Sequence, residues 1–568
     1  MKLGLVIFLL LPATGLWAQI RYEVVVDEIM SDPSPSVALP NSEWIELKNV
    51  STDTINLQGW HLADPSSESG AFPEFMLQPD SFVIVCGANA LPSMSKFGAA
   101  LSITGFPSLG NDADQIVLID SNNEVVHAVS YSRSWYRNDL KQSGGWSLEM
   151  IDTKNPCSGS SNWNASEDAS GGTPGKKNSV DGINADHQPP KLESAYGVDS
   201  LTIVAVFDEP LDSVNAGATA NYKIDNGLSV LDATSMPPLF DKVRLTLAAP
   251  MMPDVVYTLT AAGVSDCSHN TIATANTSRV GIPAEAAVSD LVINEILFNP
   301  KPNGSDFVEV YNRSTHIFDM SRLYVANRAG SGTIASITPV ALSPTEVFPD
   351  DYFVVTEDIP SLQAMYLVKY PDAVFEVPSL PSYPDDAGDV ILLNGQGLVV
   401  DEVRYSQAWQ FKLIDNPEGV SLERIDPDGP SQDQANWHSA SATSGYGTPG
   451  YRNSQYQQMQ MSAALISISP KIFSPDNDGH DDFAIIHYSM TTPGYVGNIT
   501  IFDAQGRPVR YLARSALLGL SGEWTWDGLD ENGNKLSTGV YLIYSEIFDL
   551  DGRQQHFKDS IVLARKLN

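Results

Sequence analysis

The chain has 568 residues, and 33 lysines and arginines stand against 69 aspartates and glutamates, which gives a formal net charge of −36 at pH 7. Such an acidic chain repels nucleic-acid backbones and gains nothing from anionic lipid surfaces, so neither is expected as a partner. At roughly 150 residues per domain, this length predicts about four domains.

The N-terminus predicts a secretory signal peptide over residues 1–18. Lys2 supplies the positive start, Leu3–Leu11 the apolar core, and Ala18 the cleavage point. The apolar core is too short to cross a membrane. No later stretch approaches ~18 uninterrupted apolar residues, so no transmembrane segment is expected.

Two long segments of the chain repeat each other. ADQIVLIDSNNEVVHAVSYS starts at Ala113, and AGDVILLNGQGLVVDEVRYS starts at Ala387, which is 274 residues later (387 − 113). Further pairs match in the same order: DEIM with NEIL, EWIELKN with DFVEVYN, SLE with SLE, NW with NW, and SGGTPGKKNS with SGYGTPGYRNS. We infer two copies of one domain, over 19–180 and 290–454, with an unrelated insert between them.

Each copy predicts β-strands rather than helices. WIELKN and FVEVYN alternate apolar and polar residues, which is typical of strands with one buried face. QIVLID and DVILLN are apolar runs bounded by Asp, Asn and Gly, as buried strands are. Turn-forming sequences such as GQG and DPDGP recur between them. The predicted fold class is all-β, with four tandem Ig-like β-sandwich domains after the signal peptide.

The ordered set INEIL, DFVEVYN and the closing NW…TPG…N resembles the lamin tail domain. The resemblance implies an immunoglobulin-like β-sandwich that serves as an accessory module in exported bacterial proteins, beside enzymes or adhesion domains. That family has no shared catalytic residues, so the resemblance assigns none to this chain.

The insert at 188–284 resembles the bacterial Ig-like domains of surface proteins. VAVFDEPLD from Val204 and VVYTLTAAGVSDCSHN from Val255 follow each other with the short strand spacing that a sandwich requires. Cys267 and His269 lie in a loop of this insert. Two such ligands are too few for zinc, which needs about four.

Residues 455–465 have the composition of a linker, and 466–568 return to predicted strands. The pattern F-x-P-x-x-D-G-x-x-D from Phe473, with WDGLDENG from Trp526, resembles a hook-cap-like Ig fold. Together they are similar to the C-terminal sorting domain of gliding-motility and type IX secretion cargo. The resemblance implies that the secretion machinery is a partner of this domain.

An acidic turn, FSPDNDGHDDF, lies within this last domain. Asp476, Asp478 and Asp482 surround Gly479, and hard oxygen ligands at this spacing suit a structural calcium ion that would relieve their repulsion. An EF-hand is excluded because Ile485 would occupy its twelfth position. The alternative is an exposed turn whose Asp and Asn side chains cap backbone N–H groups.

Three cysteines cannot all pair within one chain. Cys86 and Cys157 fall in the same predicted domain, so one interpretation is a bridge between them in an exported protein. The other is three small buried side chains without a bridge.

The sequence has no H-E-x-x-H, G-x-S-x-G or phosphate-loop motif, so no catalytic residue is assigned. Glu46 and Glu309 occupy matched strand positions, and we interpret them as solvent-facing strand glutamates rather than a hydrolytic pair. Trp135, Tyr136 and Trp409 are candidates for a carbohydrate-binding surface, but core packing is the favoured interpretation.

These observations predict a non-enzymatic exported protein, at the cell surface or extracellular, that acts in adhesion or as a scaffold. Its expected partners are an extracellular polysaccharide or a surface protein. The alternative is a secreted hydrolase, or an accessory subunit of one, acting on polysaccharide or nucleic acid. The sequence leaves the ligand and the oligomeric state open.

Overall fold

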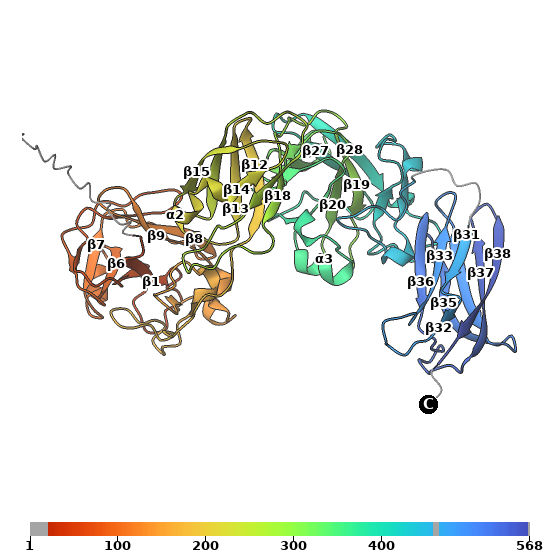
Figure 1. The fold of residues 1–568 in the computed structure, drawn as a ribbon, viewed down its shortest axis with the longest axis horizontal. Coiled ribbons are helices and arrows are strands. Elements are labelled where there is room, and N and C mark those ends of the chain that lie inside the picture. The colour runs from red at the N-terminus through yellow and green to blue at the C-terminus, as the bar shows by residue number, and fades with distance from the viewer. Residues whose placement is uncertain (1–20, 458–464, 566–568) are drawn as a thin grey trace, which may run out of the picture. The chain divides into compact units, whose positions relative to one another are not determined.

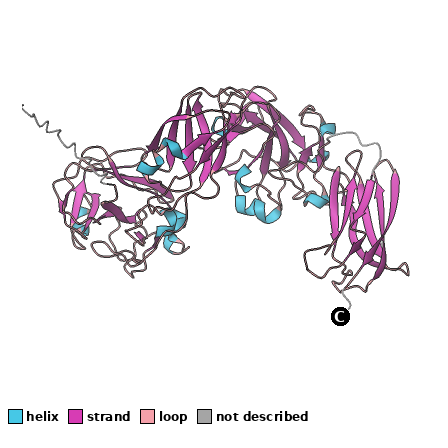
Figure 2. Cartoon of the chain, viewed as in Figure 1, coloured by secondary structure: helices cyan, strands magenta, loops and turns pink. Residues whose placement is uncertain are grey.

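The computed structural model of the protein describes residues 21–457 and 465–565. The predicted signal peptide and most of the predicted linker lie outside these ranges. The described chain is nearly all β, with short helices between the strands (Figure 2). None of its helices is both long and apolar enough to cross a membrane. The predicted all-β class of tandem β-sandwiches is therefore confirmed.

The described chain forms two compact units. One runs to Met251 and also contains Tyr257–Val280, and the other combines Met252–Val256 with the chain from Gly281 onward. Each unit holds one copy of the repeat and a further pair of sheets (Figure 1). The units are described one at a time.

The first copy packs a six-stranded sheet against a three-stranded one. Residues of both sheets form one core, which includes Ile45, Leu118 and Val129. The six-stranded sheet has the order β11 (Trp163–Ala165), β10 (Leu148–Met150), β1 (Val24–Met30), β2 (Trp44–Asn49), β6 (Phe82–Gly87) and β7 (Ala100–Ile103). The three-stranded sheet has the order β4 (His61–Ala63), β8 (Ala113–Ile119) and β9 (Val125–Ser132). A separate pair is formed by β3 (Ile55–Asn56) and β5 (Met76–Leu77).

Strand β2 is buried on both faces, although its sequence alternates apolar and polar residues. Ile45 faces the core between the sheets. Trp44 packs on the opposite face with Cys86 and with Met94 of helix α1 (Leu91–Met94). The prediction of a single buried face is therefore wrong here, because a second layer covers the outer side of the sheet.

The rest of the first unit contains two further sheets. They correspond to the predicted Ig-like insert, and their strands have the short alternating burial of a sandwich, as in β16 (Lys242–Leu247). The four-stranded sheet has the order β12 (Leu192–Asp199), β13 (Thr202–Phe207), β16 and β15 (Val230–Met236), the three-stranded sheet has the order β14 (Tyr222–Ile224), β17 (Tyr257–Ala261) and β18 (Thr277–Val280), and α2 spans Ser213–Ala216.

A disulfide joins Cys157 to Cys267, with their Cα atoms 6.5 Å apart and 110 residues between them in sequence. Both interpretations of the cysteines are therefore wrong in part: Cys157 is not bridged to Cys86, and Cys157 and Cys267 are not free thiols. Cys86 is a free thiol, fully buried on β6 among apolar side chains, so it has no access to Cys157. The bridge instead connects the first copy to the loop of the insert that also holds His269.

The second copy, in the second unit, has the same strand order as the first in its six-stranded sheet, and its other sheet has one additional edge strand, β23. Both six-stranded sheets also share a bulge, at Val26/Glu28 in β1 and at Ile293/Glu295 in β19. The six-stranded sheet has the order β30 (Trp437–Ser439), β29 (Leu422–Arg424), β19 (Leu291–Leu297), β20 (Phe307–Asn312), β25 (Tyr352–Thr356) and β26 (Val374–Glu376). The four-stranded sheet has the order β23 (Ile334–Pro339), β22 (Tyr324–Arg328), β27 (Ala387–Leu393) and β28 (Val399–Ser406). A separate pair is formed by β21 (Phe318–Asp319) and β24 (Glu346–Val347), and helix α3 spans Ile359–Met365.

The C-terminal part of the second unit is a two-sheet sandwich. Trp526 and Phe473 are buried at its centre, with ring centroids 5.1 Å apart. One sheet has the order β31 (Leu465–Ser469), β33 (Ala484–Ser489) and β36 (Ser521–Trp526), and the other has the order β32 (Ile472–Phe473), β38 (Gln554–Leu563), β37 (Gly539–Phe548), β34 (Val496–Phe502) and β35 (Pro508–Leu517).

Candidate functional site

The predicted aspartates of the acidic turn come together between β32 and β33. Asp476, Asp478 and Asp482 each offer a carboxylate oxygen, and these oxygens lie within 4.8 Å of one another. The Asp482 carboxylate also accepts hydrogen bonds from the backbone N–H groups of Asp476 (3.2 Å), Asn477 (2.6 Å) and Gly479 (2.9 Å). Asn477 and Gly479 have φ of 60° and 87°, a conformation that Asn and Gly tolerate best.

Both interpretations of this turn therefore have geometric support. The Asp-capped turn is present, as the alternative required. The oxygens are also close enough to share one hard cation. Binding of a structural calcium ion here stays a prediction.

Glu46 and Glu309, predicted to face solvent, are fully buried. Each belongs to a row of three glutamates on adjacent strands. In the first copy, Glu28 pairs in register with Glu149 on one side and with Glu46 on the other. The second copy repeats this row on β29, β19 and β20 with Glu423, Glu295 and Glu309. The prediction that Glu46 and Glu309 face solvent is therefore wrong, because the closing segment of each copy covers that face of the sheet.

The closing segment 171–180 of the first copy supplies hydrogen-bond donors to its glutamate row. The donors are backbone N–H groups and hydroxyls, which pair well with buried carboxylates. Ser147, two residues before Glu149, adds one more hydroxyl, which donates to Glu28 at 2.6 Å. The donors from the segment are the Thr173 N–H to Glu28 (2.7 Å), the Thr173 hydroxyl to Glu149 (2.8 Å), the Ser179 hydroxyl to Glu149 (2.7 Å), the Val180 N–H to Glu149 (3.1 Å) and the Gly175 N–H to Glu46.

The second copy binds its closing segment 446–455 in the same way. The Ser421 hydroxyl donates to Glu295, as Ser147 does to Glu28. In each copy the closing segment with the matched sequence TPG…N, 171–180 or 446–455, is therefore a strap that is hydrogen-bonded to the glutamate row of the sheet. The strap donors are the Thr448 N–H (2.9 Å) and hydroxyl (2.9 Å) to Glu295, the Thr448 hydroxyl to Glu423 (3.0 Å), the Ser454 hydroxyl (2.8 Å) and Gln455 N–H (2.8 Å) to Glu423, and the Gly450 N–H to Glu309 (2.6 Å).

Burial raises the pKa of Glu28, Glu46, Glu295, Glu309 and Glu423, and for the first four of these the like-charged neighbours in the row add to the effect. In the second copy the pKa of Glu295 rises to about 8, first through burial and then through Glu423, while burial raises that of Glu423 to about 7. In the first copy, burial and Glu149 raise the pKa of Glu28 well above its usual value. These groups have no exposed surface through which a substrate could be reached, so the row has a structural role.

The aromatic candidates for a carbohydrate surface are packing residues. Trp135 and Trp409 are half-buried against the two cores, and they lie 6.2 Å and 6.5 Å, centroid to centroid, from Trp163 and Trp437. Tyr136 is buried, and its hydroxyl donates to the Trp146 carbonyl at 3.1 Å. The favoured interpretation of core packing is confirmed for all three.

A second acidic group was missed at the sequence level. Asp186, Glu209 and Asp266 bring carboxylate oxygens within 4.8 Å of one another, beside the disulfide at Cys267. Burial, followed by the charges of Asp266 and Asp186, raises the pKa of Glu209 to about 8. Because the three residues are far apart in sequence and follow no motif, no spacing pattern could have revealed them.

Comparison with known families identifies a domain in the first copy. Residues 19–133 match the Lamin Tail Domain. The match ends just after β9, covers less than half of the chain, and leaves out β10, β11 and the strap. No curated protein matches the chain.

Similar solved structures are distant. They include the N-terminal part of the bacterial S-layer protein SbsC (17% identity, 29% of this chain and 45% of that chain, TM-score 0.17) and FLGD from P. aeruginosa (18%, 14% and 62%, 0.13). A Ca²⁺-stabilized adhesin from an Antarctic bacterium is 9% identical over 96% of this chain and 99% of that one, with a TM-score of 0.12. The chain spans 45% and 62% of the first two, and scores this low transfer no function.

Proposed function

We propose that this chain is an exported, non-enzymatic protein of the cell surface or extracellular space that acts in adhesion or as a scaffold. The observation that carries the proposal is the fate of the repeated polar residues. The glutamates that recur in both copies are buried and bind the strap of their own domain. The repeated glutamates thus stabilise the β-sandwich, and we infer that the loops around the sandwich carry recognition.

Two further observations support export. The first 18 residues have the composition of a signal peptide. The Cys157–Cys267 disulfide is of a kind that forms and persists in oxidising compartments outside the cytosol.

The proposed domain order is a lamin-tail-like domain at 19–180, an Ig-like domain at 188–284, a second lamin-tail-like domain at 290–454 and a C-terminal sorting domain at 466–568. The shared strand order and bulge of the two copies support the second lamin-tail-like assignment. Through the last domain the chain would engage secretion machinery, with calcium held at Asp476, Asp478 and Asp482. Its other partner would be an extracellular polysaccharide or surface protein.

Cell fractionation with and without residues 466–568 tests this proposal. The full chain is expected at the outer surface or in the medium, where added protease reaches it, and the truncated chain is expected to stay inside the outer membrane. Retention of the full chain in the cytosol would refute export. Metal-dependent turnover of a polysaccharide or nucleic acid by the purified protein would refute the non-enzymatic role in favour of a secreted hydrolase.

A further inference from the structure

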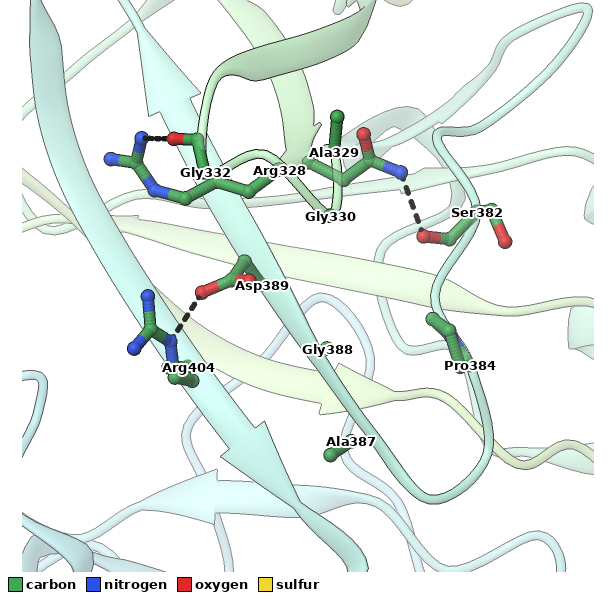
Figure 3. A pocket seen from close by; sticks show the side chains of 11 residues that line it. Arg328, Ala329, Gly330, Gly332, Ser382, Pro384, Ala387, Gly388, Asp389 and Arg404 are labelled. Carbon is green, nitrogen blue, oxygen red and sulfur yellow. Dashed lines mark hydrogen bonds and ion pairs between the residues drawn. The ribbon is translucent and has the colours of Figure 1, made fainter.

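A polar cleft opens on the four-stranded sheet of the second copy. Its volume is about 480 Å³, within the usual range of small-ligand sites. One wall is the turn between β22 and β23, which carries Gly330 and Gly332, and the other is the segment with Ser382 and Pro384 (Figure 3). The floor is formed by the start of β27 and by Arg404 of β28.

Both walls are fixed by hydrogen bonds before any ligand arrives. Arg328 donates to the Gly332 carbonyl at 2.7 Å, and its other nitrogens form a two-pronged ion pair with Glu402 at 2.7 Å each. Asn327 donates to the Ser382 carbonyl at 2.9 Å, which ties the second wall to the first. A site organised in advance loses less conformational entropy on binding.

The floor presents an acceptor and donors side by side. Arg404 lies directly opposite Asp389 in the strand register and donates to its Oδ1 through Nε at 2.9 Å. Within the described chain, the terminal nitrogens of Arg404 and the Oδ2 of Asp389 make no other hydrogen bond. The Arg404 side chain is 68% exposed, so these donors are open to solvent at the edge of the cleft, beside Asp389 (Figure 3).

The first copy lacks this charged floor, which shows that the repeated fold does not need it. By the 274-residue offset, Gln115 and Ser130 stand where the second copy has Asp389 and Arg404. The registers Ala63↔Val117 and Ala326↔Ile391 place Pro65 at the position of Arg328. The charged residues Arg328, Asp389 and Arg404 of the cleft are therefore specific to the second copy.

We propose that this cleft binds a neutral saccharide unit through a pair of neighbouring hydroxyls. One hydroxyl donates to the free oxygen of Asp389, and the next accepts from the free edge of Arg404. Pro384, Ala329 and Ala387 offer carbon surface to the C–H groups of the sugar ring. The ligand is neutral because each arginine of the cleft already faces a carboxylate and because the net charge of −36 repels polyanions.

This inference rests on the proposed function and names the ligand class of the adhesive surface. The experiment probes the full chain with an array of oligosaccharides of glucose, galactose, mannose and N-acetylglucosamine, beside oligogalacturonate as an acidic probe. Affinity for the strongest neutral probe is then measured by calorimetry. The test variants are Asp389→Asn, Arg404→Gln and Ala387→Tyr, the last of which fills the cleft from an exposed position.

Each variant has a matched control. Ala113→Tyr alters the exposed position of the first copy that corresponds to Ala387, and Arg507→Gln breaks a similar exposed pair, Arg507–Asp503 at 2.8 Å, that does not border the cleft. Each cleft variant is expected to lower affinity about tenfold or more, because Asp389→Asn and Arg404→Gln lose hydrogen bonds to charged groups and Ala387→Tyr blocks the cleft, while the controls bind as wild type does. Unchanged thermal unfolding shows that all variants are folded.

Three results would overturn the inference. Equal binding by the cleft variants would place the sugar site elsewhere and leave the adhesive function standing. Binding of oligogalacturonate alone would refute the neutral class. Absence of binding to every saccharide would refute the site itself, whereas surface localisation, measured separately by fractionation, decides the proposed function.

Discussion

The two glutamate rows differ at the bulge residue that precedes the central glutamate. In the second copy this residue is Asn294, whose side-chain amide donates to Glu309 Oε1 at 2.7 Å and to Asn453 at 2.8 Å. In the first copy it is Asp27, which has no amide hydrogen to donate. Asp27 Oδ1 and Glu46 Oε1 are both buried there without a partner among the described residues. The same backbone thus holds an amide in one copy and a second acid in the other.

Two buried acids can share such a position if one of them keeps its proton. Burial raises the pKa of Asp27 to about 7 and that of Glu46 well above its usual value. A pKa that is higher in the folded than in the unfolded state means that folding takes up a proton. The resulting stability is complete below the unfolded value near 4 and is lost as the pH rises through about 7. A single exchange of Asn for Asp therefore decides whether the residue at this bulge titrates.

The largest expected difference between the two units comes from the disulfide of the first unit. The Cys157→Ser variant, or reduction, should destabilise that unit by about 4–5 kcal/mol, because the bridge closes a loop of 110 residues in the unfolded chain. Hydrogen-exchange mass spectrometry of the full chain with and without dithiothreitol measures this unit by unit. Equal loss of protection in both units would contradict the assignment, and Cys86→Ser in place of Cys157→Ser is the control.

Removal of the central glutamate should cost about 3 kcal/mol in the unit that contains it. Glu28→Ala leaves the Thr173 N–H buried without its acceptor and the Ser147 hydroxyl with only the Gly171 carbonyl at 3.4 Å. Glu295→Ala does the same to the Thr448 N–H and to the Ser421 hydroxyl, which keeps only the Tyr446 carbonyl at 3.3 Å. Urea unfolding combined with exchange protection of each strap measures the effect. A loss confined to the strap, with the sheet unaffected, would show that the row anchors the strap alone.

Glutamine in place of the outer glutamate should have opposite effects in the two copies. Glu309 accepts on both oxygens, so Glu309→Gln sets an amide against a donor and should cost about 2 kcal/mol. Glu46 accepts on one oxygen only, so Glu46→Gln can donate toward Asp27 and should be neutral or stabilising. Each variant is the control for the other, and equal losses would refute the difference between the bulges.

Asp27→Asn should make the first copy resemble the second. The variant removes one titrating group, so the fall in stability between pH 4 and pH 7 should become shallower by about 1.4 kcal/mol per pH unit at most. Denaturant midpoints at pH 5 and pH 8 measure this slope. The reciprocal Asn294→Asp change should add a slope to the second unit, and an unaltered slope in both variants would exclude the bulge as its source.

Calcium should have the smallest effect. If the acidic turn binds with the affinity of extracellular calcium modules, 2 mM Ca²⁺ should stabilise the C-terminal sandwich by about 1 kcal/mol. The stabilisation should vanish with chelator and in Asp478→Asn, while Asp551→Asn, in an exposed turn of the same sandwich, should retain it. A calcium response that survives Asp478→Asn would place the ion elsewhere.

Much of the fold could be predicted from repetition and alternation. The 274-residue offset revealed two copies, and the structure gives them the same strand order and the same bulge. Trp135, Tyr136 and Trp409 were expected to pack against the core, and they do. These predictions succeeded because strand periodicity and repeated segments can be recognised in the sequence without knowledge of the tertiary structure.

The failures came where a distant segment changes the environment of a residue. Glu46 alternates with apolar neighbours as an exposed strand residue would, but the strap covers its position and buries it. Cys86 and Cys157 share a domain, but a loop of the next region brings Cys267 to Cys157. The signal that was available for the glutamates was their recurrence in both copies together with TPG…N, because a charged residue repeated inside a buried strand needs a repeated partner.

The strap also sets the order in which each domain can be completed. Glu28 is synthesised 145 residues before the Thr173 N–H that it binds, and Glu295 precedes Thr448 by 153 residues. A nascent chain that ends at β10 therefore carries three glutamates on an apolar sheet without the hydrogen-bond donors of the strap. Each domain closes only when its last residues emerge, which keeps the growing chain open until synthesis of that domain is finished.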